Sequence, residues 1–184
     1  MVKPLIANQR VMIDADEIVP GLWQGSVPPQ GAELQKAGFD LVVLSAREWQ
    51  PDVFDDGFFE GVEVVTAPLD DDEIVPIPRE DLRGALKAAH LSAEAIADGK
   101  KVLITCAAGM NRSGLISAMT MHLLYGWAGE VCMQEVREGR GVRRDGMWPL
   151  DNRQFEDLLE RLPARQARYE LLDVRTSRNS EPKT

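Results

Sequence analysis

Residues 105–114 read TCAAGMNRSG and bring together the two side chains that phosphate chemistry needs, a thiol and a guanidinium. Five residues separate Cys106 from Arg112. A cysteine thiolate can attack phosphorus, and an arginine can bind two phosphate oxygens at once with its planar fork of N–H groups. The same two residues would also be compatible with a buried, inert thiol beside a solvent-facing arginine. The surrounding sequence has to decide between these two interpretations.

The segment between the thiol and the guanidinium is a candidate phosphate-binding loop. It consists of Ala107, Ala108, Gly109, Met110 and Asn111. Backbone N–H groups that curl ahead of a helix N-terminus point toward a bound anion, and the helix dipole adds to the attraction. The glycine can adopt a positive φ without steric cost, which makes such a turn feasible. The same donors would favour the thiolate form of Cys106, which is the nucleophilic form.

A phosphoryl transfer to sulfur also needs an acid for the leaving oxygen and a hydroxyl that helps the thiolate to leave. Ser113 follows the arginine directly and could donate that hydrogen bond. The acid could come from the stretch APLDDDEIVP, in which Asp70, Asp71 and Asp72 lie on a predicted loop after a strand. On their own, three such aspartates would more often form a solvated loop. All three are candidates for the acid.

Taken together, these stretches resemble the cysteine-based protein tyrosine phosphatase superfamily, and its dual-specificity branch in particular. The resemblance covers residues 17–162 and follows, in chain order, PGLWQGS, VVTAPLDD, VLITCAAGMNRSG and VREGRG with the later WPLDNRQFEDLL. It implies an enzyme that hydrolyses phosphate monoesters through a cysteinyl-phosphate intermediate, without a metal or other cofactor. Phosphotyrosine in proteins is the substrate that it favours, with phosphoserine, phosphothreonine and small aryl phosphates as further candidates.

The resemblance also implies a role for each matching residue. Cys106 matches the nucleophile, Arg112 the phosphate-binding arginine and Ser113 the hydroxyl after it. Asp71 best matches the general acid, because the family pattern places this residue three positions after a proline like Pro68. The two neighbouring aspartates stay as rivals for that role.

One position departs from the family pattern. The family usually has histidine immediately before the nucleophile, where it supports the loop that activates the thiol, and this chain has Thr105 there. We therefore expect reduced activity. The alternative is a pseudophosphatase, which binds phosphate with weak turnover or none. A third hypothesis is sulfur transfer of the rhodanese type, which also uses a loop cysteine, although Arg112 and Ser113 fit phosphate better.

The composition excludes several other classes of function. The chain has 184 residues, a net charge of −9 and a sequence pI of about 4.8. Nucleic acids and anionic lipids are bound by basic surfaces, so neither a nucleic acid nor a membrane is an expected partner. The apolar runs are shorter than the ~20 residues that cross a bilayer. No secretory signal is evident, so we expect a cytoplasmic protein whose partner is its phosphorylated substrate.

The remaining titratable residues indicate neither a metal site nor a disulfide framework. Cys132, His90 and His122 fall on predicted helices and are interpreted as packing or surface residues. Their spacing does not match that of zinc ligands. A late segment rich in glycine carries Arg140, Arg143 and Arg144. By default these arginines are solvated charges, and a second anion contact from one of them is a further hypothesis.

Apolar runs alternate with amphipathic stretches, which predicts an α/β fold. Strands are predicted at 18–26, 40–46, 61–69 and 101–106. Helices are predicted at 28–39, 79–98, 112–125, 128–138 and 152–162, the last with Asp151 or Asn152 as its N-cap. We expect a single domain over residues 1–174, with a central, mostly parallel sheet flanked by helices on both faces, and a loose tail over 175–184. Cys106 would then lie at the carboxyl end of a strand, where such sheets bind ligands.

Overall fold

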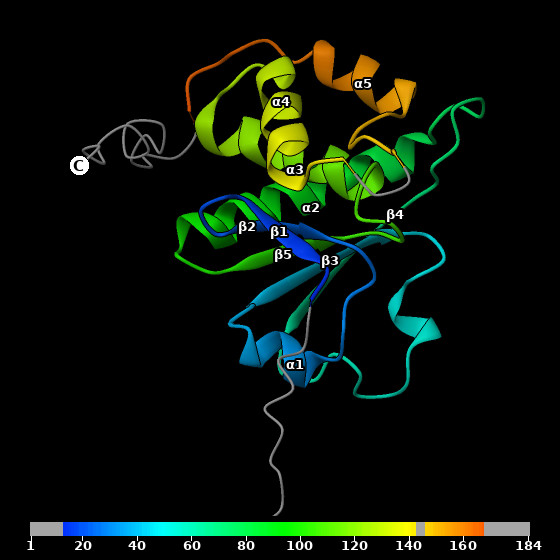
Figure 1. The fold of residues 1–184 in the computed structure, drawn as a ribbon, viewed down its shortest axis with the longest axis vertical. Coiled ribbons are helices and arrows are strands. Elements are labelled where there is room, and N and C mark those ends of the chain that lie inside the picture. Colours follow the sequence, from blue (N-terminus) through cyan, green and yellow to red (C-terminus); the bar gives the residue numbers. More distant parts are fainter. Residues whose placement is uncertain (1–12, 143–145, 168–184) are drawn as a thin grey trace, which may run out of the picture.

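A five-stranded sheet forms the centre of the protein (Figure 1). The computed structural model describes residues 13–142 and 146–167, so the expected tail lies outside the described residues. The strands are β1 (Ala15–Val19), β2 (Leu22–Gly25), β3 (Leu41–Ala46), β4 (Glu63–Leu69) and β5 (Val102–Thr105). Their order in the sheet is β1-β2-β5-β3-β4, and only the pairing of β1 with β2 is antiparallel. The predicted, mostly parallel sheet is therefore confirmed.

Helices cover both faces of this sheet, as predicted. They are α1 (Gly31–Lys36), α2 (Arg79–Ala97), α3 (Arg112–Tyr125), α4 (Gly129–Arg140) and α5 (Arg153–Glu160). Figure 1 shows α1 on one face and the other four on the opposite face. A short 3₁₀ helix, Pro51–Val53, follows β3 and was not predicted. No helix in the described part of the chain is long and apolar enough to cross a membrane.

The central strand β3 shows why the core has two halves. All six of its residues are buried, and successive side chains of a strand point to opposite faces. Leu41 and Val43 pack into the larger cluster with the apolar side chains of α2 and α3, whereas Val42 and Leu44 pack into the smaller one with Leu34 of α1. This sequence is apolar without alternation because the strand is covered on both sides.

The N-terminal part of the sheet differs from the prediction. The expected strand at 18–26 is in fact a hairpin, in which β1 ends at Val19 and β2 begins at Leu22. Pro20 has no N–H to donate to a ladder, and Gly21 has a φ of 83°, so the chain turns at this point. The helix expected at 28–39 is also shorter and covers only α1.

Local signals place the two ends of α3, the helix that follows the cysteine. β5 ends at Thr105, so Cys106 lies at the carboxyl end of a central parallel strand, as predicted. Six residues later α3 begins at Arg112. It ends at Tyr125, and the next residue, Gly126, has a φ of 71°, which suits a left-handed helix cap. α3 is buried over most of its length against α2, in which small side chains such as Ala85 and Ala89 permit close approach. The loop before α3 is therefore held at both ends by buried elements, β5 and α3.

Candidate active site

The loop between β5 and α3, residues 106–112, is called here the phosphate loop. The Cys106 side chain is buried within it, and the backbone N–H of Gly109 donates to its sulfur at 3.2 Å. The Ser113 hydroxyl lies 3.3 Å from the same sulfur. The structure thus brings the predicted thiol and the predicted hydroxyl together. Both contacts stabilise negative charge on sulfur when N–H and O–H are the donors.

Gly109 occupies a position that no other residue would fill without strain. Its φ is 71°, and a Cβ added there would lie 2.6 Å from the carbonyl carbon of Gly25. Its own carbonyl accepts hydrogen bonds from Gln24 Nε2 at 3.0 Å and from Arg140 Nε at 3.1 Å. The turn that was predicted from sequence is therefore present, and β2 and the end of α4 hold it from outside.

The amides of the phosphate loop point to what it could bind. In the part of the chain that the structure describes, the N–H groups of residues 107, 108, 110 and 111 donate to no protein acceptor. They precede α3, whose dipole places a partial positive charge at the same end. Together with the N–H of Gly109, they form a set of donors suited to a compact anion.

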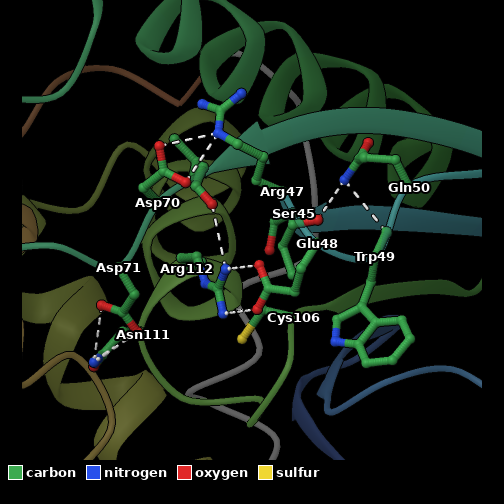
Figure 2. Close-up of polar contacts among 12 residues, drawn as sticks. Ser45, Arg47, Glu48, Trp49, Gln50, Asp70, Asp71, Cys106, Asn111 and Arg112 are labelled. Atoms are coloured by element: carbon green, nitrogen blue, oxygen red, sulfur yellow. Dashed lines mark hydrogen bonds and ion pairs between the residues drawn. The ribbon is translucent and has the colours of Figure 1, made fainter. Parts of the chain in front are cut away.

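Arg112 and Glu48 form an ion pair beside the cysteine (Figure 2). Nη1 and Nη2 of the arginine each donate to one oxygen of the Glu48 carboxylate, at 2.5 and 2.8 Å, and Nη1 also donates to the carbonyl of Leu69 at 3.3 Å. Arg112 is 7% exposed. Its Nε is buried and makes no hydrogen bond to the residues described. The outer fork of the guanidinium is therefore occupied, and the side that carries Nε remains available for an anion.

The ion pair shifts the acid–base equilibria of both partners. The hydrogen bond from Arg112 holds the pKa of Glu48 below its ordinary value, despite an opposing contribution from partial burial. For Arg112, burial acts to lower the pKa, but the hydrogen bond to Glu48 and the nearby negative charges outweigh it, so the pKa is raised. Arg112 thus stays a cation in a largely buried place.

The loop after β4, residues 70–78, is called here the acid loop, and its three aspartates have different surroundings. Asp70 accepts both of its hydrogen bonds from Arg47 Nε at 2.9 Å, and Arg47 also binds Asp81 of α2. Asp72 Oδ1 accepts from the backbone N–H groups of Ile74 and Val75, which lowers the pKa of Asp72. Both carboxylates are thus engaged in holding the loop.

Asp71 is the aspartate that contacts the phosphate loop. Its two carboxylate oxygens accept from Asn111 Nδ2 at 3.2 Å each, and Oδ1 also accepts from Asn152 Nδ2 at 3.0 Å. Figure 2 shows the Asp71 and Asn111 side chains facing each other. Of the three aspartates left open by the sequence, the geometry places this one against the loop that contains Cys106.

Comparisons with known proteins bear on this geometry. No protein-family model matches the chain, and no curated protein matches it. Solved structures do. Tk-PTP in its active form is 25% identical, with a TM-score of 0.62, over 83% of this chain and 97% of that one. Human DUSP28 is 21% identical, with a TM-score of 0.60, over 83% and 94% of the two chains. PTPMT1 in complex with PI(5)P is 17% identical, with a TM-score of 0.62, over 81% and 94%.

These matches span nearly the whole length of the solved chains. The chain has the dual-specificity phosphatase fold. The resemblance seen in the sequence is thereby confirmed for the fold.

The residue that departs from the family pattern faces away from the phosphate loop. The Thr105 hydroxyl donates to the carbonyl of Val43 on β3 at 2.8 Å, and the Thr105 carbonyl accepts from Ser45 Oγ at 2.6 Å. In this version of the dual-specificity fold, a buried pair of hydroxyls therefore fixes the end of β5 to β3.

Two residues of the site were missed or misread in the sequence. Glu48 was not predicted, although a charged residue two positions after the end of the buried strand β3 is a usable signal, since ligand sites gather at that edge. Arg140 was expected to be solvated, and this is wrong. Its side chain is 6% exposed, and besides Gly109 it binds Asp16 at 2.6 Å and Asp14 at 2.9 Å. The three nitrogens of the Arg140 guanidinium thus donate to other residues of the protein, and they leave the hypothesis of a second anion contact from this arginine without support.

The other predicted residues lie outside the site or outside the described residues. Arg143 and Arg144 belong to the second group. Cys132 is buried in the larger core cluster, and His122 is buried with its Nδ1 at 2.7 Å from the carbonyl of Trp127, so both are packing residues, as predicted. Among the described residues, no three His, Cys, Asp or Glu side chains are grouped in a way that could hold a metal ion.

Proposed function

We propose that this protein is a cysteine-dependent phosphatase, which hydrolyses phosphate monoesters through a cysteinyl-phosphate intermediate. The observation that carries the proposal is the buried Nε of Arg112, which has no hydrogen-bond partner among the described residues. It lies beside the Cys106 sulfur and a loop whose N–H groups are largely unbonded within that part of the chain. A tetrahedral dianion bound there would accept from the loop amides and from Nε of the arginine. Its phosphorus would face the thiolate.

The first chemical step transfers the phosphoryl group to sulfur. The Cys106 thiolate attacks phosphorus, the S–P bond forms, and the bond from phosphorus to the ester oxygen breaks. Asp71 donates its proton to that oxygen, so the alcohol or phenol leaves neutral. The Gly109 N–H donates to the attacking sulfur at 3.2 Å and holds it in the loop. Arg112 and the loop amides bind the equatorial oxygens, where charge is spread in the transition state.

The second step returns the enzyme to its starting state. Water attacks phosphorus and gives a proton to the Asp71 carboxylate, the S–P bond breaks, and inorganic phosphate leaves with the added oxygen. The sulfur departs as a thiolate. The Ser113 hydroxyl, 3.3 Å from that sulfur, can donate a hydrogen bond to the developing charge. Neither step needs an electron transfer or a second substrate other than water.

The substrate that we propose is phosphotyrosine in proteins, with phosphoserine and phosphothreonine as further candidates. The phosphate loop between Cys106 and Arg112 contains no lysine. Two carboxylates lie against this loop, since the half-exposed Glu48 pairs with Arg112 and the exposed Asp71 accepts from Asn111. Their negative charge repels a head group that carries several phosphates more strongly than it repels a single monoester.

The alternative is a phosphate-binding protein with weak turnover or none, because Thr105 stands where the family usually has histidine. The specific observation behind it is that the Thr105 hydroxyl donates its hydrogen bond to Val43 of β3 and, among the described residues, makes none to the phosphate loop. Any support that the histidine gives to the loop in relatives must here come from other residues.

The decisive experiment measures hydrolysis of p-nitrophenyl phosphate by the purified protein in the presence of EDTA. We expect turnover by the wild type, no turnover by Cys106→Ser, and a reduced kcat for Asp71→Asn that falls further, by about 10²-fold or more, when phenyl phosphate is the substrate. A phosphocysteine trapped by rapid acid quench would identify the intermediate. Wild-type protein that binds phosphate in an Arg112-dependent manner without turnover would replace the proposal with the binding alternative.

A further inference from the structure

Asn152 is a buried side chain that contacts both its own helix and the acid loop. It is 1% exposed. Its Oδ1 accepts hydrogen bonds from the N–H groups of Gln154 and Phe155, at 3.0 and 3.4 Å, and so caps α5. These two bonds fix the orientation of the amide, so Nδ2 faces the acid loop. There it donates to Asp71 Oδ1 at 3.0 Å and to the carbonyl of Asp72 at 3.4 Å.

Two other amide side chains complete the attachment of the acid loop. Gln154 Nε2 donates to the carbonyls of Asp72 and Val75, at 2.8 and 2.9 Å. Asn111 Nδ2 donates to both oxygens of Asp71, and its Oδ1 accepts from the backbone N–H of Asp151 at 2.9 Å. The start of α5, the acid loop and the phosphate loop therefore meet at one carboxylate.

The donors are unequally divided between the two oxygens of that carboxylate. Oδ1 of Asp71 accepts from both Asn152 and Asn111, whereas Oδ2 accepts from Asn111 alone among the described residues. A protonated oxygen is itself a donor and accepts hydrogen bonds less well than an ionised one, so the proton favours the oxygen that faces fewer N–H donors. A proton on Asp71 is therefore favoured on Oδ2, and Oδ1 can keep its bond to Asn152 while Oδ2 donates to a substrate oxygen.

We propose that Asn152 is a positioning residue for the general acid. It holds Asp71 against the phosphate loop before substrate binds, and it directs the transferable proton to Oδ2. This inference rests on the proposed function, because it assigns Asn152 a part in the protonation of the leaving oxygen. It goes beyond a structural role, since capping of α5 alone would need only Oδ1.

The test uses two variants that keep the helix cap, Asn152→Ser and Asn152→Asp, because serine and aspartate are both good N-cap residues. Serine is too short to reach Asp71, and aspartate opposes it with a like charge. The substrates are p-nitrophenyl phosphate, whose leaving group needs little protonation, and phenyl phosphate, whose leaving group needs much more. Thermal unfolding of each variant checks that the fold is intact.

For Asn152→Ser we expect kcat on phenyl phosphate to fall at least about tenfold, while kcat on p-nitrophenyl phosphate falls less than about threefold and KM changes little. For Asn152→Asp we expect the basic limb of the pH profile of kcat to move about one unit upward, because the added carboxylate opposes ionisation of Asp71. The effect of either variant should vanish in an Asp71→Asn background.

Each remaining outcome counts against the inference. Equal losses on the two esters, an unshifted pH profile, or undiminished losses in the Asp71→Asn background would reduce Asn152 to a helix cap. All three would leave the proposed function intact as long as the wild type turns over. Wild-type protein that cleaves neither ester would overturn the proposed function, and this inference with it. Should Asn152→Asp fail to fold, Asn152→Ser and its double variant still decide the question.

Discussion

The phosphate loop and the acid loop lie against each other, but different interactions hold them in place. The residues of the phosphate loop are buried or partly buried between β5 and α3, and its turn depends on Gly109 with a φ of 71°. The acid loop is largely exposed, with Ile74 at 90% and Val75 at 61%. A hollow of about 160 Å³ lies beside it, lined by Asp70, Asp72, Val75, Pro76, Ile77 and Pro78.

The two loops are therefore positioned by different means, one by backbone geometry and the other by side-chain hydrogen bonds. The phosphate loop takes its shape from backbone geometry and from the close approach of Gly25, so small changes within it are strained. The acid loop takes its position from side-chain hydrogen bonds to Asn111, Asn152, Gln154 and Arg47. Such bonds can be removed one at a time without loss of the fold, so we expect the first loop to be intolerant of substitution and the second to be adjustable.

Gly109→Ala should have the largest effect. The new Cβ would lie 2.6 Å from the carbonyl carbon of Gly25, in a backbone conformation that alanine disfavours. We expect the free energy of unfolding to fall by about 2–3 kcal/mol and kcat/KM to fall by about 10²-fold or more, since the N–H donor to the Cys106 sulfur moves as well. Chemical denaturation and aryl phosphate hydrolysis measure the two effects.

Gly38→Ala is the matched control for this substitution. Gly38 has a φ of 80°, but no atom lies within 4 Å of a Cβ built there. The control should therefore lose about 1 kcal/mol of stability from backbone strain alone and keep its kcat/KM. Equal effects of the two substitutions on activity would show that close approach to Gly25 does not shape the phosphate loop.

Arg140→Met should have the next largest effect. The substitution removes a buried guanidinium that joins the Gly109 carbonyl to Asp14 and Asp16. Both aspartates are exposed enough to regain water, so we expect a stability loss of only about 1–3 kcal/mol, together with a fall of roughly tenfold in kcat/KM. The double variant Asp14→Asn with Asp16→Asn keeps the arginine on Gly109, and it should retain most of the activity. An inactive double variant would shift the role from the arginine to its carboxylates.

The sequence predicted the residues of the phosphate loop, which are close together in the chain. It did not predict the contacts between residues that are far apart in the chain. Cys106, Arg112 and Ser113 could be placed because one turn of chain between a strand and a helix fixes all three. The partner of Arg112 could not, because Glu48 lies 64 residues away. The choice among three aspartates stayed open for the same reason, since Asn111 and Asn152 distinguish Asp71 only in the folded chain.

The hairpin at the edge of the sheet shows a different kind of error. Residues 18–26 have an apolar pattern typical of one strand. The Pro20–Gly21 pair within them was the available signal for a turn, and it indicates two strands instead of one.

The burial of Arg140, by contrast, could not be predicted. Its acidic partners lie more than a hundred residues earlier in the chain, and Asp16 is 124 residues away. Charged residues are exposed by default, and only tertiary pairing reverses that expectation.

Thr105→Val tests whether the threonine that stands in place of the usual histidine affects stability alone or activity as well. Valine has the same shape but lacks the hydroxyl that donates to Val43, so we expect a stability loss of about 1 kcal/mol. Because this hydroxyl donates to β3 and not to the phosphate loop, kcat/KM should stay within about threefold of the wild type. Ser45→Ala, which removes the reciprocal bond to the Thr105 carbonyl, is the control and should behave alike. A large loss of activity in Thr105→Val alone would give the threonine a direct part in activating the thiol.

Glu48→Gln should have the smallest effect and the clearest pH dependence. The hydrogen bond from Arg112 lowers the pKa of Glu48 from 4.5, so the ionised form stabilises the folded protein. That contribution is present above pH 4.5 and is lost as the pH falls through the lowered pKa of the folded state. The Glu48 side chain is 48% exposed, so solvent screening limits the contribution to less than about 1 kcal/mol. We expect the Tm of the variant to lie below that of the wild type at pH 7, and the difference in Tm to narrow below pH 4.5.

Glu63→Gln is the control, because it removes the looser ion pair with Lys100 at 3.7 Å, and its Tm difference should show no such pH dependence. If both variants show the same pH dependence, the Arg112 pair contributes no more than an ordinary surface contact, and the orientation of the guanidinium must come from Leu69 and the phosphate loop instead.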